Sequence, residues 1–74
     1  MPYIKIELTR EDVTREKKQQ LIKGVTNLIM EVLNKDPLLT HVVIQEIDTD
    51  NWGYNNEQVS VMREQGISSD IKKA

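Results

Sequence analysis

A proline placed directly after the initiator methionine is the feature of this sequence that could perform chemistry. When Met1 is removed, Pro2 becomes the amino terminus, and its nitrogen is then a secondary amine outside any peptide bond. An α-amino group titrates at about pH 7.7–8.0, and desolvation or a neighbouring cation favours its neutral form, which is both a base and a nucleophile. Pro2 is therefore a candidate general base. If Met1 is retained, the same nitrogen is an amide without a usable lone pair.

Taken alone, Pro2 also fits a structural role, because proline is tolerated at the first residue of a strand. Other reactive groups are scarce in this sequence. With no cysteine and a single histidine, His41, the chain has no ligand set for zinc and no thiol. Its three glycines are too far apart to form a phosphate-binding loop, and its carboxylates are scattered. Zinc, thiol and phosphate-loop mechanisms therefore have no residues to use.

One long helix is expected between two strands, the first of which would begin directly after Pro2. From Leu21 to Leu33 the apolar residues recur at helical spacing and form one continuous stripe. Thr14 can cap the start of this helix, and Pro37 prevents its extension through the preceding residue. The pattern predicts a helix over about residues 14–34.

Two strands flank this helix. Residues 3–8 alternate between apolar and polar or amphipathic side chains, which is the period of a strand with one buried face. Residues 41–47 are β-branched and mostly apolar, as expected of a second strand. A strand, a helix and a strand make a βαβ unit, whose two strands run parallel and whose crossover is right-handed.

The remainder of the chain predicts turns and a short hairpin. Residues 48–51 and 52–56 are rich in turn formers, and residues 58–61 alternate as a short strand does. A polar tail follows from about residue 64 to residue 74. Because no repeat or linker interrupts the sequence, we expect a single domain over residues 1–74. Its class is α/β (α+β), a βαβ unit with a C-terminal hairpin.

The size of the chain predicts an oligomer. A chain of 74 residues without disulfides buries only about 60% of the surface that its unfolded form exposes. Two parallel strands under one helix also leave one sheet face and both sheet edges uncovered. Joining the sheets of neighbouring chains, or stacking dimers into a ring, would cover these surfaces. Any active site is then expected to be shared between chains.

Composition excludes two classes of partner. Ten Lys and Arg against twelve Asp and Glu give a net charge of −2, and no segment concentrates the basic residues, so a nucleic-acid surface is not indicated. The longest apolar runs, such as residues 42–44, are far below the roughly 20 residues that a membrane span needs. We expect a cytoplasmic protein, which the absence of cysteine allows.

Several segments also follow one another in a recognisable order. Pro2 opens a strand, residues 16–22 start the helix, residues 42–46 lie in the second strand, and residues 51–53 precede a hairpin. Over about residues 2–63 this arrangement resembles the 4-oxalocrotonate tautomerase family. Members of that family are short β-α-β chains that form dimers or, more often, hexamers built as trimers of dimers. The resemblance implies a homo-oligomer that uses no cofactor or metal and acts on a small carboxylate substrate.

By this resemblance, Pro2 is the general base that moves a proton between oxygen and carbon of a 2-hydroxydienoate or a related enol acid, giving the conjugated keto acid. Such chemistry requires cationic or donor groups for the carboxylate and the developing enolate, and an apolar wall that excludes water. Trp52 falls where the family has an aromatic wall residue. Its structural alternative is an anchor in a core or an interface.

The two characteristic arginines of the family are not matched. The first aligns with Asp12 and Val13, so the nearest cation in that loop, Arg10, is our candidate for binding the substrate carboxylate, with Arg63 as a competitor. The second, at the start of the second strand and contributed by a neighbouring subunit, aligns with His41, which can donate one hydrogen bond when neutral. Arg10 could instead be a solvated loop charge, and His41 a strand-end residue at an interface.

The resemblance therefore implies a cofactor-independent isomerase, a keto–enol tautomerase. Two alternatives remain open on the sequence. One is a Pro2-dependent hydratase or dehalogenase of unsaturated acids, and the other is a non-enzymatic oligomeric binding protein on the same fold.

Overall fold

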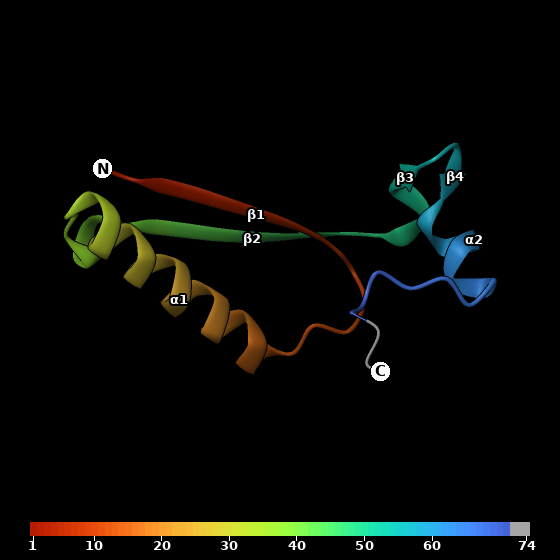
Figure 1. Ribbon diagram of the computed structural model, residues 1–74, viewed down its shortest axis with the longest axis horizontal. Coiled ribbons are helices and arrows are strands. Elements are labelled where there is room, and N and C mark those ends of the chain that lie inside the picture. Colours follow the sequence, from red (N-terminus) through yellow and green to blue (C-terminus); the bar gives the residue numbers. More distant parts are fainter. Residues whose placement is uncertain (72–74) are drawn as a thin grey trace.

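A two-stranded sheet and one long helix form the larger part of the molecule (Figure 1). The structure is a computed structural model that describes residues 1–71. Strand β1 (Tyr3–Thr9) leads to helix α1 (Arg15–Leu33), and strand β2 (His41–Ile47) returns beside β1 in parallel. The predicted βαβ unit is confirmed.

Local signals set both ends of α1. The Thr14 side chain accepts a hydrogen bond from the backbone N–H of Lys17 at 3.2 Å, which confirms Thr14 as the N-cap. At the other end Asn34 takes a left-handed conformation with φ of 53°, and its N–H donates to the Met30 carbonyl at 2.9 Å. The short 3₁₀ helix η1 (Pro37–Leu39) then reverses the chain toward β2.

The helix covers only one face of the sheet. In register, Ile6 lies beside Ile44 and Leu8 beside Glu46, and this set of side chains is partly buried. An ion pair between Lys18 of α1 and Glu46 joins the helix to this face. The opposite face, which carries Tyr3, stays uncovered within the chain.

The chain continues beyond β2 into a small unit at the far end of the sheet. It consists of the 3₁₀ helix η2 (Thr49–Asn51), strands β3 (Gly53–Tyr54) and β4 (Glu57–Gln58), and helix α2 (Val59–Glu64). The two strands pair antiparallel, as a hairpin requires. Figure 1 shows this unit at the opposite end of the sheet from the amino terminus.

The predicted strand over residues 58–61 is wrong beyond its first residue. Val59 begins helix α2, and Val59 and Met62 are 1% and 6% exposed, so the buried pair has helical i, i+3 spacing. Alternation over four residues fits a helix as well as a strand, and packing decided between them. The predicted polar tail begins at the end of α2, and its residues 72–74 lie outside the described residues.

The β3–β4 turn is formed by two asparagines. Asn55 and Asn56 have φ angles of 52° and 65°, and a two-residue hairpin turn of this kind needs positive φ at both central residues. Asparagine tolerates this region better than other residues with a side chain. The N–H of Val59 also donates to the Trp52 carbonyl at 2.8 Å, which closes the base of the hairpin.

A single chain leaves unusually much surface exposed. Its accessible surface is 6201 Å², whereas a folded monomer of 8.6 kDa exposes roughly 4,700 Å². Among the described residues, only Val59 and Met62 are buried. Large apolar side chains lie in solvent on α1, on η1 and on the free sheet face, among them Leu28, Val32, Leu38 and Tyr3.

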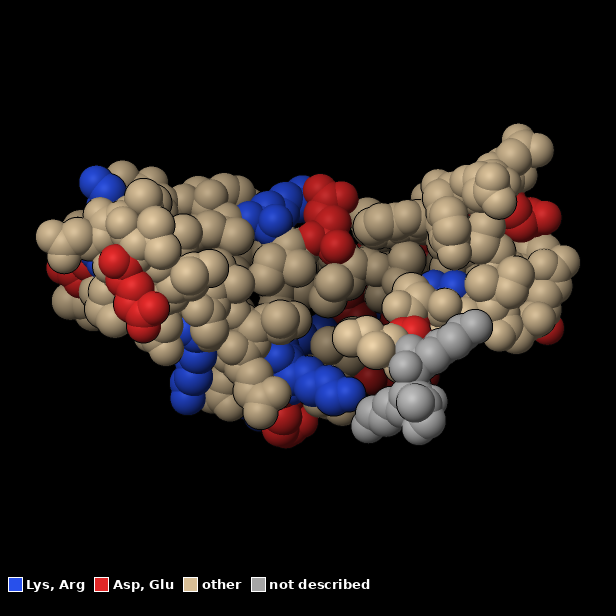
Figure 2. Space-filling model, in the orientation of Figure 1, with Lys and Arg blue, Asp and Glu red and all other residues tan. Residues whose placement is uncertain are grey.

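Charge is distributed without a dominant sign. On the face drawn in Figure 2, basic and acidic side chains are interspersed, and no continuous basic patch covers it. Within residues 1–71, no helix has both the length and the apolar character that crossing a bilayer requires.

We expect the folded protein to sediment as a multiple of its 8.6 kDa chain mass at micromolar concentration, because exposed apolar surface of this extent is stabilised by contact with further chains. Sedimentation equilibrium, with circular dichroism on the same samples, measures mass and helix content together. A species of monomer mass that keeps its full helical signal would contradict this prediction.

Candidate functional site

Pro2 lies where the two long strands begin. Its carbonyl accepts a hydrogen bond from the backbone N–H of His41 at 3.0 Å, and Tyr3 and His41 are register partners. Pro2 is half-buried, whereas Met1 is 83% exposed. The structure therefore brings Pro2 and His41 together, as two of the four predicted site residues.

Arg10 lies at the other end of β1. Its backbone N–H donates to the Ile47 carbonyl at 2.8 Å, and its side-chain Nε donates to Asp48 Oδ1 at 2.9 Å. A longer contact of 3.4 Å joins Nη2 to the Glu46 carbonyl. The side chain is 61% exposed, so its remaining N–H groups face solvent. Arg10 is thus held in place but keeps donors for a ligand.

Strand β1 lies between Pro2 and Arg10 and keeps them far apart. Seven residues at about 3.3 Å each make the strand roughly 23 Å long, which exceeds the reach of any small carboxylic acid. Pro2 and Arg10 of the same chain cannot touch one substrate molecule. The predicted site, Pro2 with Arg10, His41 and Trp52, can form only between chains.

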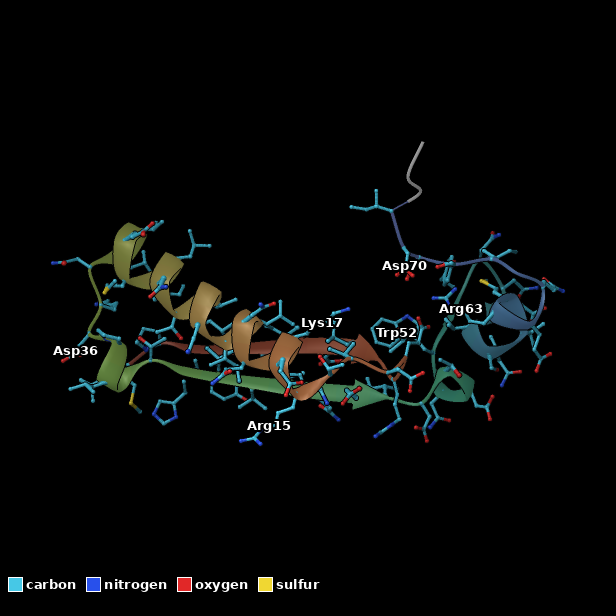
Figure 3. The ribbon with its side chains drawn as sticks, turned by 90° about the horizontal axis from the view of Figure 1, so that it is seen from below. Arg15, Lys17, Asp36, Trp52, Arg63 and Asp70 are labelled. Atoms are coloured by element: carbon cyan, nitrogen blue, oxygen red, sulfur yellow. The ribbon has the colours of Figure 1, made fainter. Side chains whose placement is uncertain are left out.

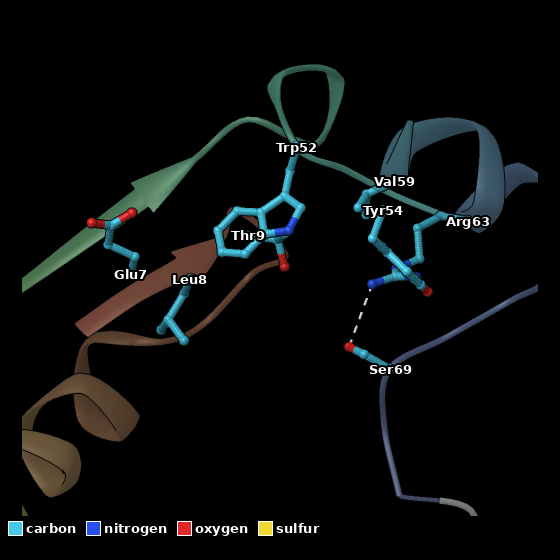
Figure 4. A pocket seen from close by; sticks show the side chains of 8 residues that line it. All are labelled: Glu7, Leu8, Thr9, Trp52, Tyr54, Val59, Arg63 and Ser69. Atoms are coloured by element: carbon cyan, nitrogen blue, oxygen red, sulfur yellow. Dashed lines mark hydrogen bonds between the residues drawn. The ribbon is translucent and has the colours of Figure 1, made fainter. Parts of the chain in front are cut away.

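Trp52 lines a cavity at the Arg10 end of the sheet, which we call the Trp52 pocket. The cavity has a volume of about 260 Å³. Its walls are formed by Glu7, Leu8, Thr9, Trp52, Tyr54, Val59, Arg63 and Ser69 (Figure 4). The first three belong to β1, Trp52 directly precedes β3, and the others belong to the hairpin, α2 and the segment after it. In Figure 4 the indole lies beside the end of β1, across the pocket from Ser69.

Arg63 is the arginine that lines the Trp52 pocket, while Arg10 does not line it. Its Nε donates to Glu11 Oε1 at 2.9 Å, its Nη1 to the Ile67 carbonyl at 2.9 Å, and its Nη2 to Ser69 Oγ at 3.4 Å. Figure 3 shows Trp52 and Arg63 near each other beyond the end of the sheet. Because Glu11 balances the charge of Arg63, the pocket of one chain has no excess of positive charge.

Sequence reasoning missed Tyr54, Glu11 and Ser69 as neighbours of this pocket. A signal for Tyr54 existed, since it directly follows Trp52 and Gly53 at the predicted hairpin. No local signal marks Glu11, whose partner is 52 positions away. Within residues 1–71, no group of three or more potential ligand side chains is arranged to hold a metal ion.

Residues 2–62 match the family model described as "Tautomerase enzyme". The chain therefore belongs to the tautomerase family, which confirms the resemblance drawn from its sequence.

Similar proteins share most of their length with this chain. It is 48% identical over 65 residues to a probable tautomerase K2 of Dickeya dadantii, with 88% of this chain and 97% of the relative covered. The crystal structure of DmpI from Helicobacter pylori has a TM-score of 0.79 at 43% identity, with 85% of this chain and 97% of that chain covered. A heterohexameric 4-oxalocrotonate tautomerase from Chloroflexus aurantiacus shares the fold, with a TM-score of 0.76 at 15% identity, covering 81% and 95%.

Proposed function

We propose that the protein is a cofactor-independent keto–enol tautomerase of small enol acids such as 2-hydroxydienoates, with Pro2 as the general base after removal of Met1. The observation that carries this proposal is the anchoring of Pro2 by the 3.0 Å hydrogen bond from His41 to its carbonyl. This bond fixes the ring at the start of β1, so the freed amine would have one defined position. Met1, at 83% exposed, is open to removal by an aminopeptidase.

The complete site requires a second chain paired along the free edge of β1. A two-fold axis places the same strand of both chains edge to edge, and the two strands then run antiparallel. With the pair centred on Ile6, Tyr3 lies opposite Thr9 of the partner subunit. Pro2 would then lie next to Arg10 of the partner subunit and to its Trp52 pocket. This arrangement unites the two ends of the sheet that one chain keeps apart.

The proposed reaction is a proton transfer without change of oxidation state. The neutral Pro2 amine takes the proton from the 2-hydroxyl oxygen of the substrate and returns a proton to the conjugated carbon, which leaves the keto acid. Arg10 binds the substrate carboxylate by charge-assisted hydrogen bonds, and His41 donates to an oxygen of the substrate. The Trp52 ring keeps water away, which strengthens these polar interactions.

We expect Met1-free protein to ketonise 2-hydroxydienoates or phenylenolpyruvate-like enols, and the Met1-retaining form to lose roughly 10²–10⁴-fold in rate, because its Pro2 nitrogen is an amide. Intact mass assigns each preparation, and ultraviolet absorbance follows the enol. If the Met1-free form is no faster than buffer, the proposal fails in favour of a binding protein. Turnover of halogenated unsaturated acids in place of enols would support a dehalogenase.

A further inference from the structure

Two separate parts of the chain form the walls of the Trp52 pocket. One wall is the end of β1, and the other consists of the hairpin, α2 and the segment up to Ser69. The ion pair between Arg63 of α2 and Glu11 of the loop after β1 crosses from one wall to the other, with Nε and Oε1 2.9 Å apart. Among the described residues, no other ion pair joins α2 to the β1 side.

We propose that the Arg63–Glu11 pair is a clamp that sets the width of the Trp52 pocket and positions the neighbouring Arg10. Arg63 is in this view a positioning residue and Arg10 the residue that contacts substrate. The part that concerns Arg10 rests on the proposed tautomerase function, whereas the width of the pocket does not.

The guanidinium group suits this role because it joins three segments at once, namely α2 itself, the loop after β1 and the segment after α2. Its Nε holds the loop after β1, and its two terminal nitrogens hold the Ile67 carbonyl and the Ser69 hydroxyl. Figure 4 shows the contact to Ser69 across the pocket. A lysine would supply a point charge without this fixed fork, so it could not hold all three segments in one geometry.

Partial burial makes this ion pair stronger than a surface pair. The side chains of Arg63 and Glu11 are 22% and 29% exposed, whereas those of Arg10 and Asp48 are 61% and 65% exposed. Reduced exposure weakens solvent screening, so the charges interact more strongly. Breaking the pair by removing one partner also leaves the other partly desolvated and unpaired.

The Arg63–Glu11 pair can affect the position of Arg10 because Glu11 is bonded directly to Arg10 in the backbone. Arg10 and Glu11 are consecutive, and each is tied to a different element, Arg10 to Asp48 after β2 and Glu11 to α2. When Glu11 is released, one of these two ties is lost and the loop can shift. A misplacement of about 1 Å at a binding group can lower activity by roughly 100-fold.

Trp52 provides a direct readout because it is the one tryptophan of the chain. We expect Glu11→Gln and Arg63→Lys to shift Trp52 fluorescence to longer wavelength and to increase its quenching by acrylamide, since the pocket opens to water. Glu64→Gln and Arg15→Lys are matched controls, because both side chains are exposed and make no ion pair among the described residues. Both controls should have the same Trp52 emission wavelength and acrylamide quenching as the parent protein. Unchanged fluorescence in both clamp variants, with the fold intact by circular dichroism, overturns the proposal.

Kinetics then test the link to Arg10. In Glu11→Gln we expect KM to rise roughly 10-fold to 100-fold with kcat nearly unchanged, because a misplaced Arg10 loses contact with substrate and transition state alike. Glu11→Asp, which keeps the charge, should recover part of the loss. An altered fluorescence without any rise in KM would overturn the positioning of Arg10. If the parent protein has no tautomerase activity, the proposed function fails and the fluorescence result alone decides on the clamp.

Discussion

Replacing Pro2 with alanine is expected to lower the kcat/KM of the Met1-free protein by roughly 10²–10⁴-fold, the usual contribution of general acid–base catalysis. Alanine keeps a free amino terminus, so the substitution changes the basicity and geometry of the amine and not its presence. The ring of Pro2 prevents rotation of the amine about the N–Cα bond, which alanine permits, and the His41 hydrogen bond to the Pro2 carbonyl remains possible in the variant. Steady-state kinetics on enol substrates measure the loss.

Two controls make this result interpretable. Intact mass must show that Met1 is absent from both the parent and the Pro2→Ala protein, because a retained methionine would abolish the amine in either. Sedimentation must show the same assembly, since the proposed site draws Arg10 and Trp52 from a partner subunit. Unchanged kinetics in a variant that passes both controls would remove Pro2 from the mechanism.

The βαβ unit could be predicted because its signals are local and long. Helix α1 extends over about five turns, its apolar stripe covers most of them, and its ends are marked by Thr14 and by Pro37, both readable from the sequence alone. The segment over residues 58–61, which was predicted as a strand, has a much shorter pattern. Four residues are too few to distinguish a strand period of 2 residues from a helical period of 3.6 residues. The helix is favoured because it buries Met62 together with Val59.

The candidate site also has a part that the sequence could indicate and a part that only the structure reveals. Pro2 could be proposed from the sequence because the chemistry expected of it depends on one covalent neighbour, Met1. The Glu11–Arg63 and Arg10–Asp48 pairs join residues 52 and 38 positions apart, so only the folded chain reveals them. Which residues share one end of the sheet follows from the parallel βαβ topology, but which of their side chains meet depends on how the hairpin and α2 pack.

Removal of the Arg10 side chain is the second large effect that we expect. Arg10→Ala should lower kcat/KM by roughly 10-fold to 150-fold, the equivalent of about 1.5–3 kcal/mol for a charge-assisted hydrogen bond. The loss should fall mainly on KM, because a carboxylate remote from the reacting carbon is bound both before and during proton transfer. Arg10→Lys should be impaired less, since it keeps the charge but not the bidentate geometry.

Two comparison variants decide whether Arg10 holds this role. His41→Ala tests the other candidate donor, which lies beside Pro2. Asp48→Asn keeps Arg10 but weakens the contact that orients its Nε, so a smaller loss than in Arg10→Ala is expected. A kcat/KM within about twofold of the parent in Arg10→Ala, with strong impairment in His41→Ala, would transfer carboxylate binding to His41.

A double variant separates Arg10 from the Arg63–Glu11 clamp. If Glu11 affects KM through the position of Arg10, then Glu11→Gln should raise KM in the parent protein and have no further effect on KM in the Arg10→Ala background. The same reasoning applies to Arg63→Lys. Losses that multiply in the double variants would mean that Arg63 contacts the substrate independently of Arg10, and carboxylate binding would then belong to the arginine that lines the Trp52 pocket.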